Sequence, residues 1–177
     1  MRSLILGLFL VGALGTPYHD AIGAGDDKAL MHAIAADPGQ INEIGPGGQT
    51  PLMNAVLSGN VMAVKILLAA RADTSIGEKD GYTPMHGAGF QGRAEIASML
   101  IKHGLDPSDM HRDGYTPLHR ACWGGEKRHT DMVKVLLEAG VSPKEPSGSG
   151  QLPIDMVRGN PMTRQVLSEW LKKKDEI

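Results

Sequence analysis

The sequence predicts an all-α repeat solenoid built from short helix-turn-helix units. The main evidence is self-similarity: T-P-L-M at Thr50, T-P-M-H at Thr83 and T-P-L-H at Thr116 follow one another at 33-residue intervals. A degenerate copy, L-P-I-D, begins 36 residues later at Leu152, so the third unit holds a three-residue insertion. Self-similarity at such a period is typical of solenoids. The composition, 41% hydrophobic but only 4% aromatic, favours helices packed through small side chains.

The first 15 residues, M-R-S-L-I-L-G-L-F-L-V-G-A-L-G, have the layout of a secretory signal peptide. One positive charge at Arg2 precedes an uncharged apolar run, and the small residues Ala13 and Gly15 follow. The run is shorter than the roughly 20 apolar residues that span a bilayer. We therefore expect cleavage after Gly15, with a retained membrane anchor as the alternative. Residues 16–24 are then expected to form a linker.

Each T-P motif predicts the start of a short first helix. The Thr side chain can cap the first turn, and the Pro that follows takes the first helical position, where no backbone N–H is needed. Apolar patterns such as V-M-A-V-K-I-L-L-A-A predict a second helix in each unit. Gly59, Gly92 and Gly125 lie at matching positions between the two helices. The insertion, around residues 126–129, is expected to lengthen the loop between the helices of the third unit.

The second helices are predicted to end at Gly104 and Gly140, because glycine readily adopts the left-handed conformation that closes a helix. Arg71 holds this position in the first unit, where a side chain costs about 1 kcal/mol. We therefore expect that turn to be looser or differently shaped. Asp-Gly pairs before two of the motifs predict hairpin tips that join one unit to the next. These pairs are Asp80-Gly81 and Asp113-Gly114.

Two segments, D-G-Y-T-P-M-H-G-A-G-F-Q-G (80–92) and D-G-Y-T-P-L-H-R-A-C-W-G-G (113–125), resemble ankyrin repeats. The resemblance implies helix-turn-helix units joined by β-hairpin tips, within a repeat domain over residues 25–173. It implies full repeats at about 47–79, 80–112 and 113–148. Residues 25–46 look like an N-terminal capping unit with a shortened second helix, and residues 149–173 look like a C-terminal cap.

The composition argues against several classes of function. With 18 Lys and Arg against 20 Asp and Glu, the chain carries a net charge of −2 and offers no basic stripe for nucleic acid. A single cysteine cannot form an intramolecular disulfide. There is no G-x-S-x-G motif and no phosphate-binding glycine loop, and a small solenoid lacks a deep pocket. We expect no catalytic residues, no cofactor and no small-molecule substrate.

Histidines raise the question of a metal site. His86 and His119 hold the fourth position of the motif, where the resemblance implies hydrogen bonds to the Thr and to neighbouring backbone. Zinc needs three or four converging ligands, so no metal site is expected. His103 and His111 are expected to be solvated. Cys122 is a candidate for intermolecular oxidation, although burial would make its thiol inert.

The resemblance implies that a partner binds in the concave groove made by the tips and first helices. Aromatic and Arg side chains contribute most of the binding energy in protein interfaces, and four of the six aromatic residues after residue 15 fall on this face. The candidate partner-binding residues are Lys79, Tyr82, Phe90, Arg112, Tyr115, Arg120 and Trp123. Local packing is the alternative, in which the Tyr rings lie on adjacent tips and Phe90 or Trp123 fills space beside glycines.

The last four residues, Lys174-Asp175-Glu176-Ile177, resemble the Lys-Asp-Glu-Leu signal that retrieves soluble proteins to the endoplasmic reticulum. Ile replaces the final Leu, and a solvated helix end is the alternative. Together the two ends predict a location in the endoplasmic reticulum lumen, with a secreted or periplasmic location as alternatives.

From these features we expect a non-catalytic adaptor of the secretory pathway that is monomeric alone. It would bind a protein partner, and it would have no transmembrane span after signal cleavage. The alternatives are a structural subunit permanently docked in a larger complex, including a membrane complex, and a bacterial periplasmic ankyrin protein.

Overall fold

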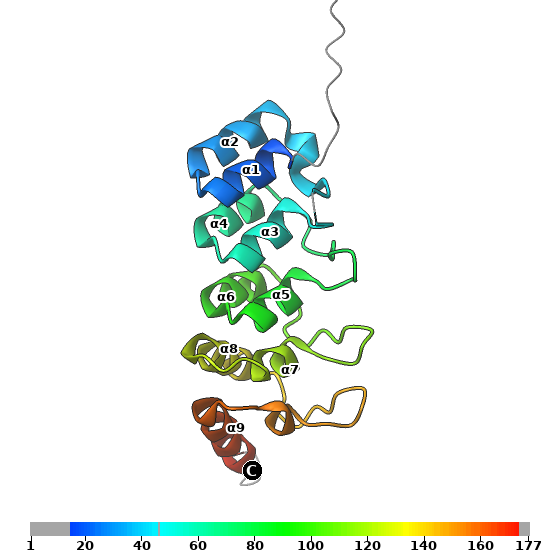
Figure 1. Ribbon diagram of the computed structural model, residues 1–177, viewed down its shortest axis with the longest axis vertical. Coiled ribbons are helices and arrows are strands. Elements are labelled where there is room, and N and C mark those ends of the chain that lie inside the picture. The colour runs from blue at the N-terminus through cyan, green and yellow to red at the C-terminus, as the bar shows by residue number, and fades with distance from the viewer. Residues whose placement is uncertain (1–14, 46, 174–177) are drawn as a thin grey trace, which may run out of the picture.

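The computed structural model describes residues 15–45 and 47–173, which form a stack of helical units (Figure 1). The predicted retrieval signal, and the predicted signal peptide apart from Gly15, lie outside the described residues. Four units are helix pairs: α1 (Pro17–Ala24) with α2 (Asp27–Ala36), α3 (Pro51–Ser58) with α4 (Val61–Ala69), α5 (Pro84–Gln91) with α6 (Ala94–Lys102), and α7 (Pro117–Cys122) with α8 (Lys127–Glu138). The short 3-10 helix η1 (Pro38–Asn42) follows α2, and η2 (Pro153–Met156) with α9 (Pro161–Lys173) ends the stack.

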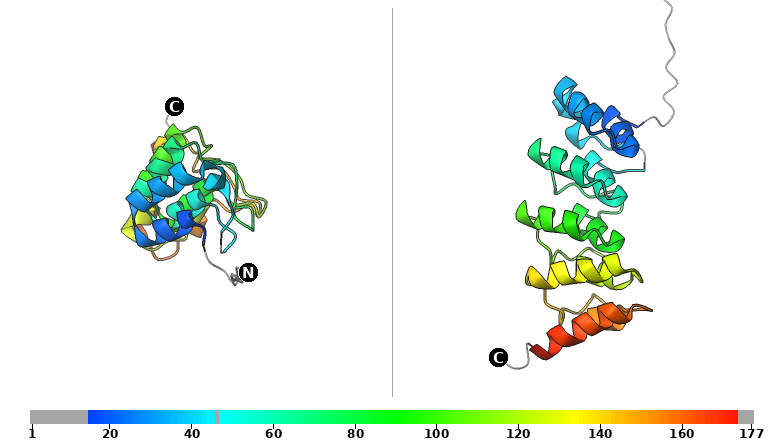
Figure 2. Two further views of the ribbon diagram at one scale, coloured as in Figure 1. Left: turned by 90° about the horizontal axis from the view of Figure 1, so that it is seen from above. Right: turned by 90° about the vertical axis from the view of Figure 1, so that its left-hand side faces the viewer.

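Equivalent helices stack on one another in two layers. The first helices α1, α3, α5 and α7 form one layer, and α2, α4, α6, α8 and α9 form the other (Figures 1 and 2). Leu67, Leu100 and Leu136 hold matching positions in α4, α6 and α8, and all three are fully buried. The described residues contain no β-strand. The predicted all-α repeat fold is therefore confirmed.

The T-P motifs begin the first helices as the sequence predicts. Thr83 and Thr116 have extended backbone, and the Pro after each opens the helix. Thr83 Oγ1 lies 2.8 Å from His86 Nδ1, and Thr116 Oγ1 lies 2.8 Å from His119 Nδ1. These contacts confirm the expected bond between each histidine and its Thr, and Nε2 of His119 also lies 3.3 Å from the Gln151 carbonyl oxygen. In the first repeat, where Met53 replaces the histidine, Thr50 Oγ1 instead accepts a bond from the Met53 backbone N–H.

The expectation of a linker at residues 16–24 is wrong. Thr16 caps α1 with extended backbone, and its Oγ1 lies 2.7 Å from His19 Nδ1, the same contact that the later motifs make. Tyr18 and Ile22 on α1 are buried in the core. The first unit is thus a complete helix pair, in which α2, with 10 residues, is a second helix of full length.

The joining segments are tight turns, whereas β-hairpins were expected. In the tip of residues 78–82, the Gly81 N–H donates to the Glu78 carbonyl at 2.7 Å, and the Glu78 N–H donates to the Tyr82 carbonyl at 3.0 Å. The tip of residues 111–115 has the same pair of bonds. All the tips project on one side of the stack (Figure 1).

The third unit has the longer loop that the sequence predicts, since residues 123–126 separate α7 from α8, whereas residues 59–60 and 92–93 separate the helices of the two preceding repeats. Its second helix is longer as well. α8 has 12 residues, whereas α4 and α6 have nine each. The preceding turn also differs from its counterparts. Gly59 and Gly92, which follow α3 and α5, are left-handed. Trp123, which follows α7, has a φ of −74°, and Gly125 is not left-handed.

Arg71 adopts the left-handed conformation expected of glycine, with a φ of 64°. Its backbone N–H donates to the Leu68 carbonyl at 3.0 Å, and Gly104 makes the equivalent bond to Ile101 at 2.9 Å. The turn at Arg71 therefore has the same shape as the glycine turns, and the expectation of a different shape is wrong.

Candidate partner-binding site

Three aromatic rings surround the guanidinium of Arg120, which projects from α7. Its carbon Cζ lies 4.8 Å from the centroid of the Tyr82 ring, 5.1 Å from that of Tyr115 and 4.5 Å from that of Trp123. These distances are within the range of cation–π interactions. Arg120 is only 8% exposed. We call Tyr82, Asp113, Tyr115, Arg120 and Trp123 the Arg120 cluster.

The positive charge of Arg120 is paired within the cluster. Its guanidinium forms an ion pair with Asp113, and the Tyr82 hydroxyl donates a hydrogen bond of 2.9 Å to the same carboxylate. Partial burial alone would raise the pKa of Asp113. Hydrogen bonds from His111, Tyr82 and the Tyr115 N–H, together with the charge of Arg120, lower it to about 2. Asp113 is therefore ionised at neutral pH.

His111 lies against the neighbouring tip, so the expectation that it is solvated is wrong. It is buried, and its ring centroid lies 4.0 Å from that of Tyr82. Its Nε2 lies 2.9 Å from the Asp80 carbonyl oxygen, in the preceding tip. His111 thus helps to hold two consecutive tips together.

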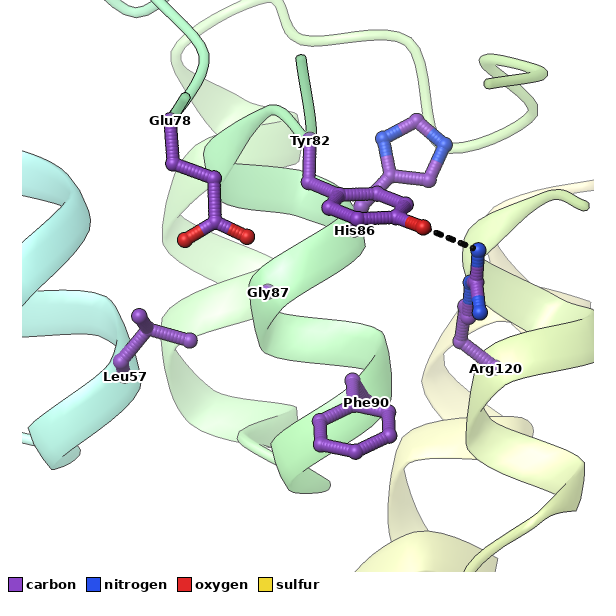
Figure 3. A pocket seen from close by; sticks show the side chains of 7 residues that line it. All are labelled: Leu57, Glu78, Tyr82, His86, Gly87, Phe90 and Arg120. Carbon is purple, nitrogen blue, oxygen red and sulfur yellow. Dashed lines mark hydrogen bonds between the residues drawn. The ribbon is translucent and has the colours of Figure 1, made fainter. Parts of the chain in front are cut away.

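A hollow of about 230 Å³ opens beside the Arg120 cluster (Figure 3). It is lined by Leu57, Glu78, Tyr82, His86, Gly87, Phe90 and Arg120. These residues come from three consecutive units: Leu57 from α3, Arg120 from α7, and the others from α5 and the tip of residues 78–82. The hollow is an open depression on the face formed by the first helices.

The structure divides the seven candidate residues into two groups. In the Arg120 cluster, Tyr82, Tyr115 and Trp123 each lie against Arg120. Phe90, in contrast, is 53% exposed and lies at the rim of the hollow. Lys79 and Arg112 are exposed on the tips. Glu78, which also lines the hollow, was not among the candidates because it lies outside the repeated motif.

The part of the chain that the structure describes offers neither a cluster of metal ligands nor a reactive thiol. No group of three or more His, Cys, Asp or Glu side chains in the described residues could hold a metal ion. Burial raises the pKa of the Cys122 thiol to about 12, so the reactive thiolate is scarce at neutral pH. Burial lowers the pKa of His86 and that of His119. Within residues 15–45 and 47–173, no helix is long and apolar enough to cross a membrane.

The fold defines a helical repeat module with an open hollow on the face formed by its first helices. The chain belongs to the ankyrin repeat family, because the family model for ankyrin repeats in three copies matches residues 15–111 and 74–147. Members of this family are typically non-catalytic binding modules, and ankyrin repeats indicate protein–protein interaction.

Similar proteins include the Notch-regulated ankyrin repeat-containing protein B of Danio rerio, which is 33% identical over 68 residues. The Notch-regulated ankyrin repeat-containing protein of Xenopus tropicalis is 31% identical over 68 residues. Each match covers 37% of this chain, and it spans 61% and 60% of the two relatives respectively. The chain is thus distantly related to these proteins over part of their length.

Proposed function

We propose that the protein is a non-catalytic adaptor that binds a protein partner on the face around the hollow. The observation that carries this proposal is the exposed Phe90 ring beside a hollow that is also lined by Tyr82 and Arg120 of the Arg120 cluster. Anchors in interfaces are typically aromatic side chains next to well-packed pockets. The cluster is already paired internally, so this part of the lining is preorganised and loses little conformational entropy on binding.

The binding face can be tested with exposed residues, whose replacement leaves the core intact. We expect a variant with Phe90→Ala, Lys79→Glu and Arg112→Glu to lose a partner that the unchanged protein retains from an extract of secretory compartments. A control with Met62→Ala and Lys65→Glu changes exposed residues of α4, in the other layer, and should retain the partner. Equal capture by both variants would move the site to another face.

We further propose that the adaptor works in the lumen of the endoplasmic reticulum. The support is the signal-like pattern of residues 1–15 together with the retrieval-like residues 174–177. Cleavage after Gly15 would leave Thr16, the cap of α1, as the first residue. In eukaryotic cells, deletion of residues 174–177 should move the protein into the culture medium. Unchanged retention, or an N-terminus at Met1 in the isolated protein, would contradict this location.

A further inference from the structure

Gly87 lines the hollow at a position where the neighbouring repeats carry longer side chains. Asn54, Gly87 and Arg120 hold equivalent positions, four residues after the Thr of each motif. A Cβ atom on Gly87 would lie 3.0 Å from Met53 Cε and 3.2 Å from Leu57 Cδ2. These distances are tighter than ordinary van der Waals contact, so Gly87 allows the side chains of α3 to pack closely against α5, and the hollow beside it holds no side chain at this position.

The lining of the hollow carries one uncompensated charge. Glu78 is half-buried, and its carboxylate points toward the space above Gly87 (Figure 3). The ion pairs among the described residues do not include Glu78. Arg120 is the other charged residue of the lining, and Asp113 pairs with it. His86 is largely neutral at pH 7, because burial lowers its pKa. Lys79 lies on the same tip but is exposed and is not part of the lining.

The remaining lining is aromatic and aliphatic. Tyr82 and Phe90 bring two rings to the hollow, and Leu57 forms the opposite wall (Figure 3). Aromatic faces attract cations, and the aliphatic stem of a long basic side chain packs well on apolar surface. An acidic side chain would face repulsion from Glu78, and an apolar one would leave the Glu78 carboxylate desolvated without a partner.

We propose that the hollow binds a positively charged side chain, lysine or arginine, of the protein partner. The stem lies along Leu57 and Phe90, and the charged group meets the Glu78 carboxylate. This inference rests on the proposed function and specifies the chemistry of the partner.

The test uses peptides selected for binding to the full-length protein from a random displayed library. We expect the enriched peptides to share a Lys or Arg at one fixed position. Replacing this residue by norleucine, which keeps an aliphatic chain but no charge, should weaken binding by about tenfold. In the Glu78→Gln protein the same replacement should change affinity by about twofold or less. The Glu95→Gln control removes an exposed charge from α6 and should keep the tenfold effect.

The possible failures are distinguishable. Enriched peptides without a fixed basic residue, or an equal norleucine effect in the Glu78→Gln and unchanged proteins, would overturn the cation proposal. If the binding of those peptides is still lost in the Phe90→Ala protein, the proposed binding face stands. If Phe90→Ala leaves the binding of the enriched peptides unchanged, the proposal that this face binds the partner is wrong as well. A selection that enriches no peptide overturns the cation proposal as well.

Discussion

The hydroxyl of Tyr82 donates a hydrogen bond of 2.9 Å to the carboxylate of Asp113, so two consecutive tips are tied together 31 residues apart in the chain. Arg120 pairs with the same carboxylate. Replacing Asp113 by Asn would leave a buried guanidinium without its counter-charge. We expect a loss of about 2 kcal/mol in the free energy of unfolding, measured by urea denaturation. Asp80→Asn, at the equivalent position of the preceding tip, is the control and should be nearly neutral.

The same carboxylate predicts a dependence of stability on pH. Its pKa falls from 3.8 to about 2 in the folded protein. Because the folded-state pKa is the lower one, the contribution of Asp113 is present above pH 3.8 and is lost as the pH falls toward 2. The unfolding free energy should therefore decrease more steeply on acidification in the unchanged protein than in Asp113→Asn. Parallel curves over this range would show that the carboxylate is not stabilised by folding.

Arg71 marks a position where a smaller residue should stabilise the protein. A non-glycine residue in the left-handed conformation is strained, so Arg71→Gly should raise the free energy of unfolding by about 1 kcal/mol. The reverse comparison is Gly104→Ala at the equivalent turn, where the φ of 97° disfavours a side chain. This variant should lose about 1 kcal/mol. Thermal denaturation of both variants measures the gain of stability expected for Arg71→Gly and the loss expected for Gly104→Ala. A lower stability of Arg71→Gly would show that the arginine side chain makes a contact that compensates for its strain.

Helix α1 should contribute to stability, although the sequence suggested a linker. Tyr18 is 1% exposed, and its hydroxyl donates to the Asp37 carbonyl at 2.8 Å. Tyr18→Ala should therefore cost about 3 kcal/mol in urea denaturation. Met31→Ala, at an exposed site on α2, serves as the comparison and should have little effect. Equal stability of the two variants would mean that α1 is not docked in solution.

The two glycines between α7 and α8 should differ in their response to substitution by alanine. A Cβ on Gly124 would clash with the His129 ring, whereas a Cβ on Gly125 meets nothing within 4 Å. Gly124→Ala should lower the midpoint of thermal unfolding by several degrees, roughly the effect of 1–3 kcal/mol. Gly125→Ala should leave it unchanged. If Gly125→Ala lowered the midpoint of thermal unfolding as much as a substitution at a left-handed glycine would, the observed conformation of this turn would be contradicted.

The repeat period predicted most of the fold, because the motif positions carry local physical roles that do not depend on distant residues. Thr caps a helix and Pro begins it wherever they occur, so α3, α5 and α7 start as expected. The copy at Thr16 was missed because Tyr18 replaces the usual apolar residue. Its position directly after a predicted cleavage point also favoured the linker interpretation.

The site was less predictable because its geometry depends on contacts between units. The register placed Tyr82 and Arg120 on one face, but it could not show that they contact each other across 38 residues. His111 looked like a solvated tip residue for the same reason. Gly87 lines the hollow and also allows Met53 and Leu57 to pack closely against α5, and no local pattern in the sequence distinguishes it from a glycine that serves close packing alone.

The hollow takes Leu57 from one repeat, Phe90 from the next and Arg120 from a third. In evolutionary terms, binding specificity in such an array resides in the order of its repeats. A recombination event that deletes or duplicates one repeat would preserve the stacking of the helices but would give Phe90 or Arg120 a different neighbour. Transplanting the 80–112 segment alone into another array would likewise carry over the glycine and the phenylalanine without a complete wall around them.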